Sequence, residues 1–237
     1  MRRRLIIMIM LLVAISVLGV IGWLLIRGTA YSPSRDLLRE FFSEPGKRAA
    51  LITHMTAPCP NAPFLLPSTG FVGFLYNDPT APYTPLNPHT GIDIFGDNKP
   101  GTIPVYAAYD GYLTRLPGWK SALIIRIPKD PLNPSRQIWT YYTHMASESG
   151  SESYISPDFP TGTSEKFVKQ GTLLGYQGLF DPSHVIKMHL HFSVVLSDDS
   201  GVFRNETYFS NTIDPSPYFG FTLNAAKNPT LPVRCGL

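Results

Sequence analysis

Downstream of Pro58, frequent proline and glycine residues divide the chain into short apolar runs, and this pattern constrains the fold most. The 237 residues include 23 Pro and 19 Gly. Both residue types interrupt helices, and no long 3.6-residue periodicity is present in this part of the chain. Runs rich in aromatic and β-branched residues span 70–76, 91–95, 105–109, 111–116, 122–127, 137–144, 172–177 and 189–196. Their spacing predicts an all-β domain built of antiparallel sheets.

The N-terminal segment has a different character. Residues Leu5–Ile26 carry no charge, and a helix of this length would span the roughly 30 Å hydrocarbon core of a membrane. Because Arg2, Arg3 and Arg4 precede it, we expect a single-pass anchor in the cytoplasmic membrane, with the rest of the chain outside. A cleaved signal peptide is the alternative, with a weak cleavage pattern at 28–30, and it would give a secreted protein. The apolar run is longer than the core of about 7–15 residues in most signal peptides.

Between this anchor and the β domain, residues 29–57 are expected to form a juxtamembrane spacer, with the cytoplasmic tip and anchor occupying 1–28. Ser34 is placed to cap a short helix. Its apolar positions are Leu37, Leu38, Phe41 and Phe42, and Pro45-Gly46 would end it.

The charge balance gives no reason to expect a nucleic-acid partner. Four of the 20 Lys and Arg residues flank the apolar N-terminal run, so the rest of the chain, with its 17 Asp and Glu residues, is close to neutral. The sequence also lacks a basic cluster with interleaved aromatic residues. We therefore expect no binding to nucleic acid, although the pI is 8.8.

The two cysteines, Cys59 and Cys235, lie near the two ends of the expected β domain. A location outside the cytoplasm permits a disulfide. We expect a bridge that clasps the ends of the domain, and two unpaired buried thiols are the alternative.

Two short stretches bring imidazoles and a carboxylate onto common faces. In PHTGIDIFG (88–96), positions four apart in an extended segment share a face, so His89 and Asp93 can converge. In KMHLHFSV (187–194), His189 and His191 share one face of a strand. Taken alone, the first pair is more typical of a solvated pair near a turn, and the second of ordinary half-buried histidines.

Two histidines and a carboxylate are a common ligand set for catalytic zinc, which keeps its fourth position for water or substrate. Four candidate ligands are one too many for such an open site. Either the site is closed and structural, or one histidine has another role. His144 ends the aromatic run 137–146, where it is either a surface residue or a third element of the site. No H-E-x-x-H motif supplies a glutamate base, so nearby histidines would have to assist proton transfer.

Five motifs in order resemble those of the lysostaphin-type zinc endopeptidases, also called β-lytic metallopeptidases, many of which are murein hydrolases. The motifs are HTGIDI (89–94), GTIPVYAAYDGYL (101–113), YYTH (141–144), VKQGTLLGYQG (168–178) and HLHF (189–192). The resemblance implies a compact antiparallel β core with the metal in a groove. It places a zinc peptidase domain over 58–237, with its core motifs within 85–197.

By position, the resemblance implies that His89, Asp93 and His191 hold Zn²⁺. The other two, His144 and His189, would be catalytic residues that polarise the attacking water and stabilise the oxyanion. The implied activity is that of a membrane-anchored, extracytoplasmic zinc metalloendopeptidase that hydrolyses peptide cross-links or bridges of bacterial peptidoglycan. A non-catalytic module that binds the wall or activates another hydrolase is one alternative, and a zinc peptidase acting on proteins is another.

The sequence departs from the family pattern in two loops. LFDPSHVIKM (179–188) replaces a Gly/Ser/Thr-rich turn that ends in Gly-Pro, and the polar loop 145–165 after His144 is extended. Both are expected to line the substrate groove. We interpret Asp181 and His184 in the first loop as ordinary surface residues.

Overall fold

A computed structural model describes residues 2–29, 33–54, 57–183 and 186–235. Its α-helices are α1 (Arg2–Thr29), α2 (Pro33–Ser43), α3 (Arg48–Leu51) and α4 (Ser216–Phe219), and its 3₁₀ helices are η1 (Pro45–Lys47), η2 (Phe209–Asn211) and η3 (Ala225–Lys227). Its strands are β1 (Phe71–Val72), β2 (Ile92–Phe95), β3 (Pro104–Tyr106), β4 (Gly111–Thr114), β5 (Leu123–Ile127), β6 (Ile138–Thr143), β7 (Lys166–Val168), β8 (Leu173–Tyr176), β9 (His189–Leu196) and β10 (Thr212–Ile213).

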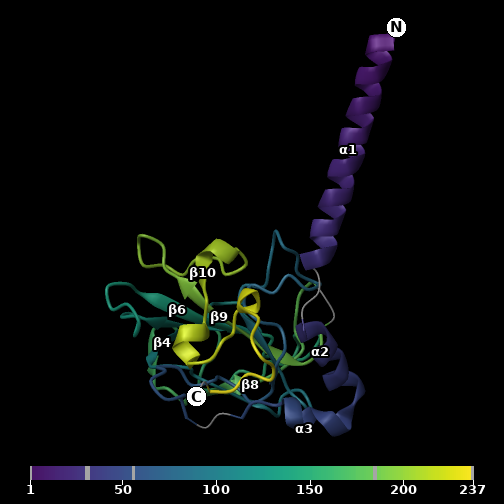
Figure 1. The fold of residues 1–237 in the computed structure, drawn as a ribbon. Coiled ribbons are helices and arrows are strands. Elements are labelled where there is room, and N and C mark those ends of the chain that lie inside the picture. Colours follow the sequence, from purple (N-terminus) through teal and green to yellow (C-terminus); the bar gives the residue numbers. More distant parts are fainter. Residues whose placement is uncertain (1, 30–32, 55–56, 184–185, 236–237) are drawn as a thin grey trace.

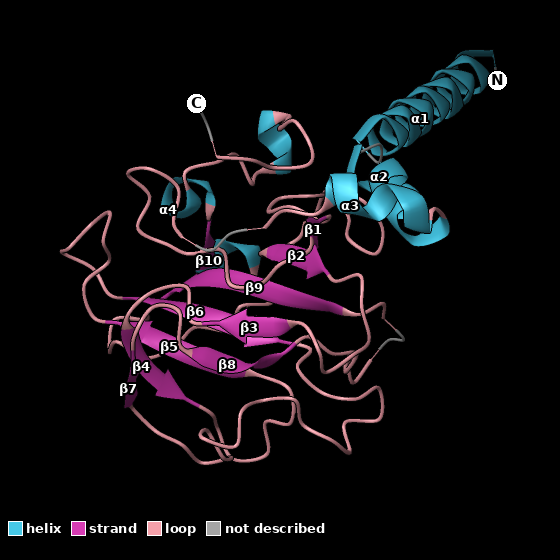
Figure 2. Cartoon of the chain, turned by 90° about the horizontal axis from the view of Figure 1, so that it is seen from below, coloured by secondary structure: helices cyan, strands magenta, loops and turns pink. Residues whose placement is uncertain are grey.

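An eight-stranded sheet organises the β domain. Its order is β1-β2-β9-β6-β5-β4-β7, with β10 also paired to β9, and neighbouring strands run antiparallel. A second, two-stranded sheet of β3 and β8 lies beside it (Figure 2). The predicted antiparallel β core is therefore confirmed.

Each of the predicted apolar runs contains a strand, but β7 and β10 were not predicted. β7 is three residues long and pairs at the edge of the sheet, where Lys166 and Phe167 are exposed. β10 is only two residues long. Neither is long enough to show a clear alternation of apolar and polar residues. These two strands therefore form because they pair with a neighbouring strand, and the local sequence pattern does not predict them.

The two faces of the large sheet carry different side chains. On β9, Leu190, Phe192 and Val194 enter the main hydrophobic core, where they meet residues of β3 and β8 such as Val105 and Leu174. The alternate positions, from His189 to Val195, point to the opposite face because successive side chains of a strand alternate. On that face, Phe95 and Val195 belong to two separate apolar clusters. The predicted histidines lie between these clusters.

The apolar N-terminal run forms the helix α1, which extends away from the β domain in Figure 1. A membrane crossing needs about 20 consecutive, mainly apolar helical residues. Within the part of the chain that the structure describes, no helix meets the length and apolarity needed for a crossing. The single-pass anchor expected over Leu5–Ile26 is therefore not supported.

The short helix expected after α1 is α2, which ends at Ser43, just before Pro45-Gly46, as predicted. It begins at Pro33, so Ser34 lies inside its first turn instead of capping it. Leu38 and Phe41 are buried in a cluster that also contains Phe71 and Phe95 of the sheet. Part of the expected spacer therefore packs directly on the β domain.

The expected disulfide is present. Cys59 and Cys235 are bonded across a sequence separation of 176 residues, and no free cysteine remains. The bridge joins the first part of the β domain to its C-terminal segment.

Candidate metal centre and active site

Three potential metal ligands converge where β2 pairs with β9. Asp93 and His191 are direct cross-strand partners, and His89 lies four residues before Asp93, in the segment that leads into β2. His89 Nε2 lies 3.0 Å from His191 Nδ1 and 3.2 Å from Asp93 Oδ1, and His191 Nδ1 lies 2.9 Å from Asp93 Oδ1. All three side chains are buried. A tetrahedral zinc ion about 2 Å from each ligand holds its ligand atoms about 3.3 Å apart, so the donor set fits this metal.

Hydrogen bonds to the remaining ring nitrogens set the tautomers of the two histidines in this cluster. His89 Nδ1 donates to the carbonyl of Leu75 at 3.0 Å, which leaves Nε2 free to bind a metal. His191 Nε2 lies 2.8 Å from Ser193 Oγ and 3.6 Å from Glu206 Oε2. Metal-binding histidines are commonly oriented by carbonyl or carboxylate partners of this kind.

The other two predicted histidines lie beside this cluster. His189 Nδ1 donates to the carbonyl of Lys187 at 2.7 Å, and its Nε2 lies 3.7 Å from Asp93 Oδ1. His144 Nδ1 donates to the carbonyl of Phe180 at 2.8 Å, and its ring lies 4.5 Å from that of His189. Each ring therefore keeps an unprotonated Nε2. Among the described residues, only His89, Asp93 and His191 form a group of three or more side chains that could hold a metal ion.

His144 has an unusual backbone conformation. Its φ is 72°, in the left-handed region that non-glycine residues rarely adopt. β6 therefore ends at Thr143, one residue earlier than predicted. Strained backbone of this kind is concentrated at functional sites, where the surrounding structure maintains it.

The electrostatics separate the histidines into two kinds. Burial, together with the neighbouring rings of His189 and His191, lowers the pKa of His144 to about 3. Burial likewise lowers the pKa of His189. Burial would also lower the pKa of His191, but the hydrogen bonds that its ring donates to the carboxylates of Asp93 and Glu206, and their negative charge, outweigh burial and raise that pKa to about 10. His144 and His189 are therefore neutral near pH 7, whereas His191 must release a proton when it becomes a metal ligand.

The carboxylate of the cluster is ionised. Burial would raise the pKa of Asp93, but the imidazoles of His89, His189 and His191 hold it well below its ordinary value. Asp93 is thus available as an anionic ligand.

Two residues near the cluster were not predicted from the sequence. Tyr83 stacks on His89 with ring centroids 4.4 Å apart, and burial raises the pKa of its hydroxyl well above the ordinary value. Glu206, from the segment between β9 and β10, accepts a hydrogen bond from Thr90 Oγ1 at 3.1 Å. Neither residue lies in a motif quoted above, and Glu206 is 116 positions from Thr90, so no local signal identifies it.

A pocket of about 400 Å³ opens over this cluster. Its wall includes His89, His144, His191 and Glu206. Residues 180–183 of the loop 179–188 line it, as expected, whereas no residue of 145–165 does. Asp181, interpreted as an ordinary surface residue, belongs to the wall. His184 lies outside the described residues.

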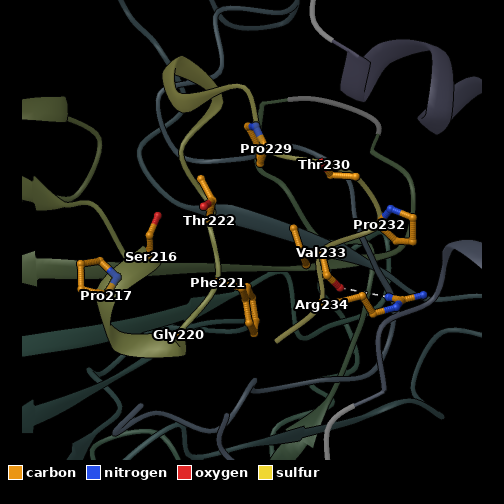
Figure 3. A pocket seen from close by; sticks show the side chains of 10 residues that line it. All are labelled: Ser216, Pro217, Gly220, Phe221, Thr222, Pro229, Thr230, Pro232, Val233 and Arg234. Atoms are coloured by element: carbon orange, nitrogen blue, oxygen red, sulfur yellow. Dashed lines mark hydrogen bonds between the residues drawn. The ribbon is translucent and has the colours of Figure 1, made fainter. Parts of the chain in front are cut away.

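A second pocket, of about 590 Å³, lies among C-terminal residues (Figure 3). Its wall is rich in proline, and Arg234 is its only charged residue among those described. The Arg234 guanidinium already donates to Thr53 Oγ1 and to the carbonyl of Val233, both at 3.0 Å. Of these two pockets, the one lined by His89, His144 and His191 therefore holds the side chains suited to catalysis or metal binding.

No family model and no curated protein matches the chain. Several solved structures are similar to it. The catalytic domain of the antimicrobial peptidase lysostaphin from Staphylococcus simulans is 20% identical, with a TM-score of 0.37, covering 56% of this chain and 79% of that chain. A zinc-containing peptidase from Vibrio cholerae is 17% identical, with a TM-score of 0.34, covering 69% of this chain and 36% of that chain.

A mutant catalytic domain of the prophage-encoded M23 protein EnpA from Enterococcus faecalis is 23% identical, with a TM-score of 0.32, covering 65% of this chain and 98% of that chain. Because these TM-scores lie below 0.5, the function proposed below rests on the site itself. The chain is thus similar to lysostaphin-type and M23 peptidase structures, and it carries a buried His-Asp-His cluster.

Proposed function

We propose that the protein is a zinc-dependent endopeptidase that hydrolyses peptide cross-links or bridges of bacterial peptidoglycan. One observation carries the proposal: His89, Asp93 and His191 present three ligand atoms to one point, and His144 and His189 lie against them with their Nδ1 atoms already bonded. In this proposal only one of the paired histidines in HLHF acts as a ligand, which would account for the excess of candidate ligands in the sequence.

His89, Asp93 and His191 would hold the zinc ion, which would supply a Lewis acid able to polarise the peptide carbonyl and to lower the pKa of water. The residues of the chain perform the proton transfers. His144 and His189 are neutral near pH 7, and each keeps an unprotonated Nε2 beside the ligand cluster. One Nε2 can accept a proton from the attacking water and later donate it to the departing amine. The other Nε2, which carries no proton near pH 7, can accept a hydrogen bond from the attacking water and so orient and polarise it.

The cell-wall substrate is supported by the five ordered motifs, which resemble those of murein hydrolases. The disulfide between Cys59 and Cys235 favours a compartment outside the cytoplasm, where such bonds persist.

The test uses the zinc-loaded full chain and cross-linked muropeptides, with products analysed by mass spectrometry. We expect defined cleavage by the native protein, none after chelation and strongly reduced cleavage in H189A. Glu152→Gln, in an exposed side chain of the loop 145–165, is the matched control and should retain activity. Stoichiometric zinc without cleavage of any muropeptide would instead favour a non-catalytic wall-binding module. Cleavage of unfolded proteins alone would favour a general zinc peptidase.

A further inference from the structure

The ring of His189 is supported from behind by another aromatic ring. Phe95 is 4% exposed, and it stacks on His189 with ring centroids 4.9 Å apart and an interplanar angle of 30°. The carbonyl of Lys187 accepts a hydrogen bond from Nδ1–H of the same imidazole. One contact therefore sets the plane of the ring, and the other sets the direction in which Nε2 points.

The helix α2 contacts the ring that supports His189 and the side chain of Lys187. Phe42 packs edge-on against Phe95, with ring centroids 5.6 Å apart and an interplanar angle of 87°. The ammonium group of Lys187 lies 5.8 Å above the ring of Phe42. A residue from the segment expected to be a spacer therefore contacts Phe95, which holds the ring of His189, and also lies under the side chain of Lys187, whose carbonyl accepts from that ring.

This packing leaves no free space between α2 and the sheet. Gly73 lies between them, and a Cβ atom at this position would come within 2.6 Å of Leu38 Cδ2 on α2 and 2.9 Å of the Phe95 ring. Phe41 of the same helix stacks on Phe71 at 5.5 Å, and Phe71 is the cross-strand partner of Phe95. The position of Phe95 thus depends on the seating of the helix.

We infer that α2 is a positioning element of the active site, with Phe42 as the positioning residue that holds His189 through Phe95. The inference rests on the proposed function, in which His189 transfers a proton. It gives the N-terminal segment a role in turnover: the orientation of His189 is set by residues before the β domain as well as by those within it. Phe42 does not touch the ligands, so its removal should leave metal binding unchanged.

The test compares Phe42→Ala with Leu37→Ala in the zinc-loaded full chain. Leu37 packs against the apolar cluster that contains Phe95, but it has no aromatic ring to pack edge-on against Phe95. We expect Phe42→Ala to lower kcat about tenfold, because catalytic groups lose efficiency when misplaced, with KM and zinc stoichiometry unchanged. Leu37→Ala should keep the native kcat. Phe42→Tyr, which retains the ring, should restore it.

A second readout does not depend on turnover. The Cε1–H signal of His189 in a ¹³C–¹H spectrum, assigned with H189A, should be a single sharp peak in the native protein and in Leu37→Ala. In Phe42→Ala it should broaden or shift. If Phe42→Ala does not fold, Phe42→Leu, which keeps the apolar volume without the ring, replaces it in both measurements.

The inference is overturned if the His189 signal is the same in Phe42→Ala as in Leu37→Ala, or if both variants lose kcat equally. If the native protein cleaves no muropeptide, the proposed function fails. In that case the signal of His189 still decides whether α2 positions the ring.

Discussion

Neighbouring residues of β9 serve opposite faces of the large sheet. Leu190 and Phe192 enter the main hydrophobic core, whereas His189 and His191 are buried on the other face beside Asp93. Burying polar groups is tolerated only when they are hydrogen-bonded, and these imidazoles have a partner at each ring nitrogen or face the ligand cluster. The core face therefore stabilises the fold. The opposite face carries the candidate ligands and catalytic histidines, and their positions depend on the folded sheet. Substitutions on the two faces should have separable effects.

The largest effect is expected for His191→Ala. This change removes one of the three proposed ligands and leaves Asp93 without its 2.9 Å partner. We expect the variant to lose stoichiometric zinc and all turnover while remaining folded. Metal analysis after gel filtration, together with circular dichroism, measures both properties. A variant that retained one zinc ion per chain would show that His191 is not a ligand.

The next effect concerns His189, two positions away on the same face. We expect H189A to keep its zinc and to lower kcat by about 10²–10⁴-fold, the usual contribution of a positioned general acid or base. Loss of zinc in this variant would show that His189 is itself a metal ligand and not only a proton-transfer residue.

On the core face, Phe192→Ala should act on stability alone. Phe192 is fully buried and contacts Tyr142 and Phe219 through their rings, at 5.2 and 5.5 Å. Removing such a ring typically lowers the free energy of unfolding by about 3–5 kcal/mol. Urea unfolding monitored by tryptophan fluorescence tests this value. Zinc affinity of the folded protein should be unchanged, and a large change in that affinity would contradict the separation of the two faces.

The smallest effect is expected for Glu206→Gln. The carboxylate lies 3.6 Å from His191 Nε2 and accepts a hydrogen bond from Thr90. Loss of such an outer carboxylate typically weakens metal binding about 10–100-fold. Competition with a zinc chelator measures the affinity, with Glu165→Gln as the control, because Glu165 pairs with Arg126 on the surface. Equal zinc affinities in Glu206→Gln and Glu165→Gln would show that Glu206 does not contribute to metal binding.

Much of the core face could be predicted from the sequence, because it depends on local patterns. Short runs rich in aromatic and β-branched residues, such as 122–127 and 189–196, predicted β5 and β9. The histidines and Asp93 were singled out because short-range spacing places them on common faces. The structure brings them together through the pairing of β2 with β9.

The remaining features depend on contacts that no local pattern encodes. Glu206 reaches His191 from a segment without a motif, and Phe42 reaches Phe95 from outside the β domain. The left-handed backbone of His144 follows from the turn after β6, where Met145 N–H donates to the carbonyl of Ser121. The interpretation of residues 5–26 as a membrane anchor used the uncharged run and the arginines before it, and the structure does not support it.

The central claim is that zinc is held by two imidazoles and one carboxylate, with His144 and His189 outside the coordination sphere. X-ray absorption spectroscopy at the zinc edge of the metal-loaded protein tests it most directly, because imidazole rings give a recognisable multiple-scattering pattern. We expect scattering from two imidazoles together with oxygen ligands in the native protein, and the same spectrum in H189A. Three or four imidazoles in the native spectrum, or the loss of one in H189A, would contradict it.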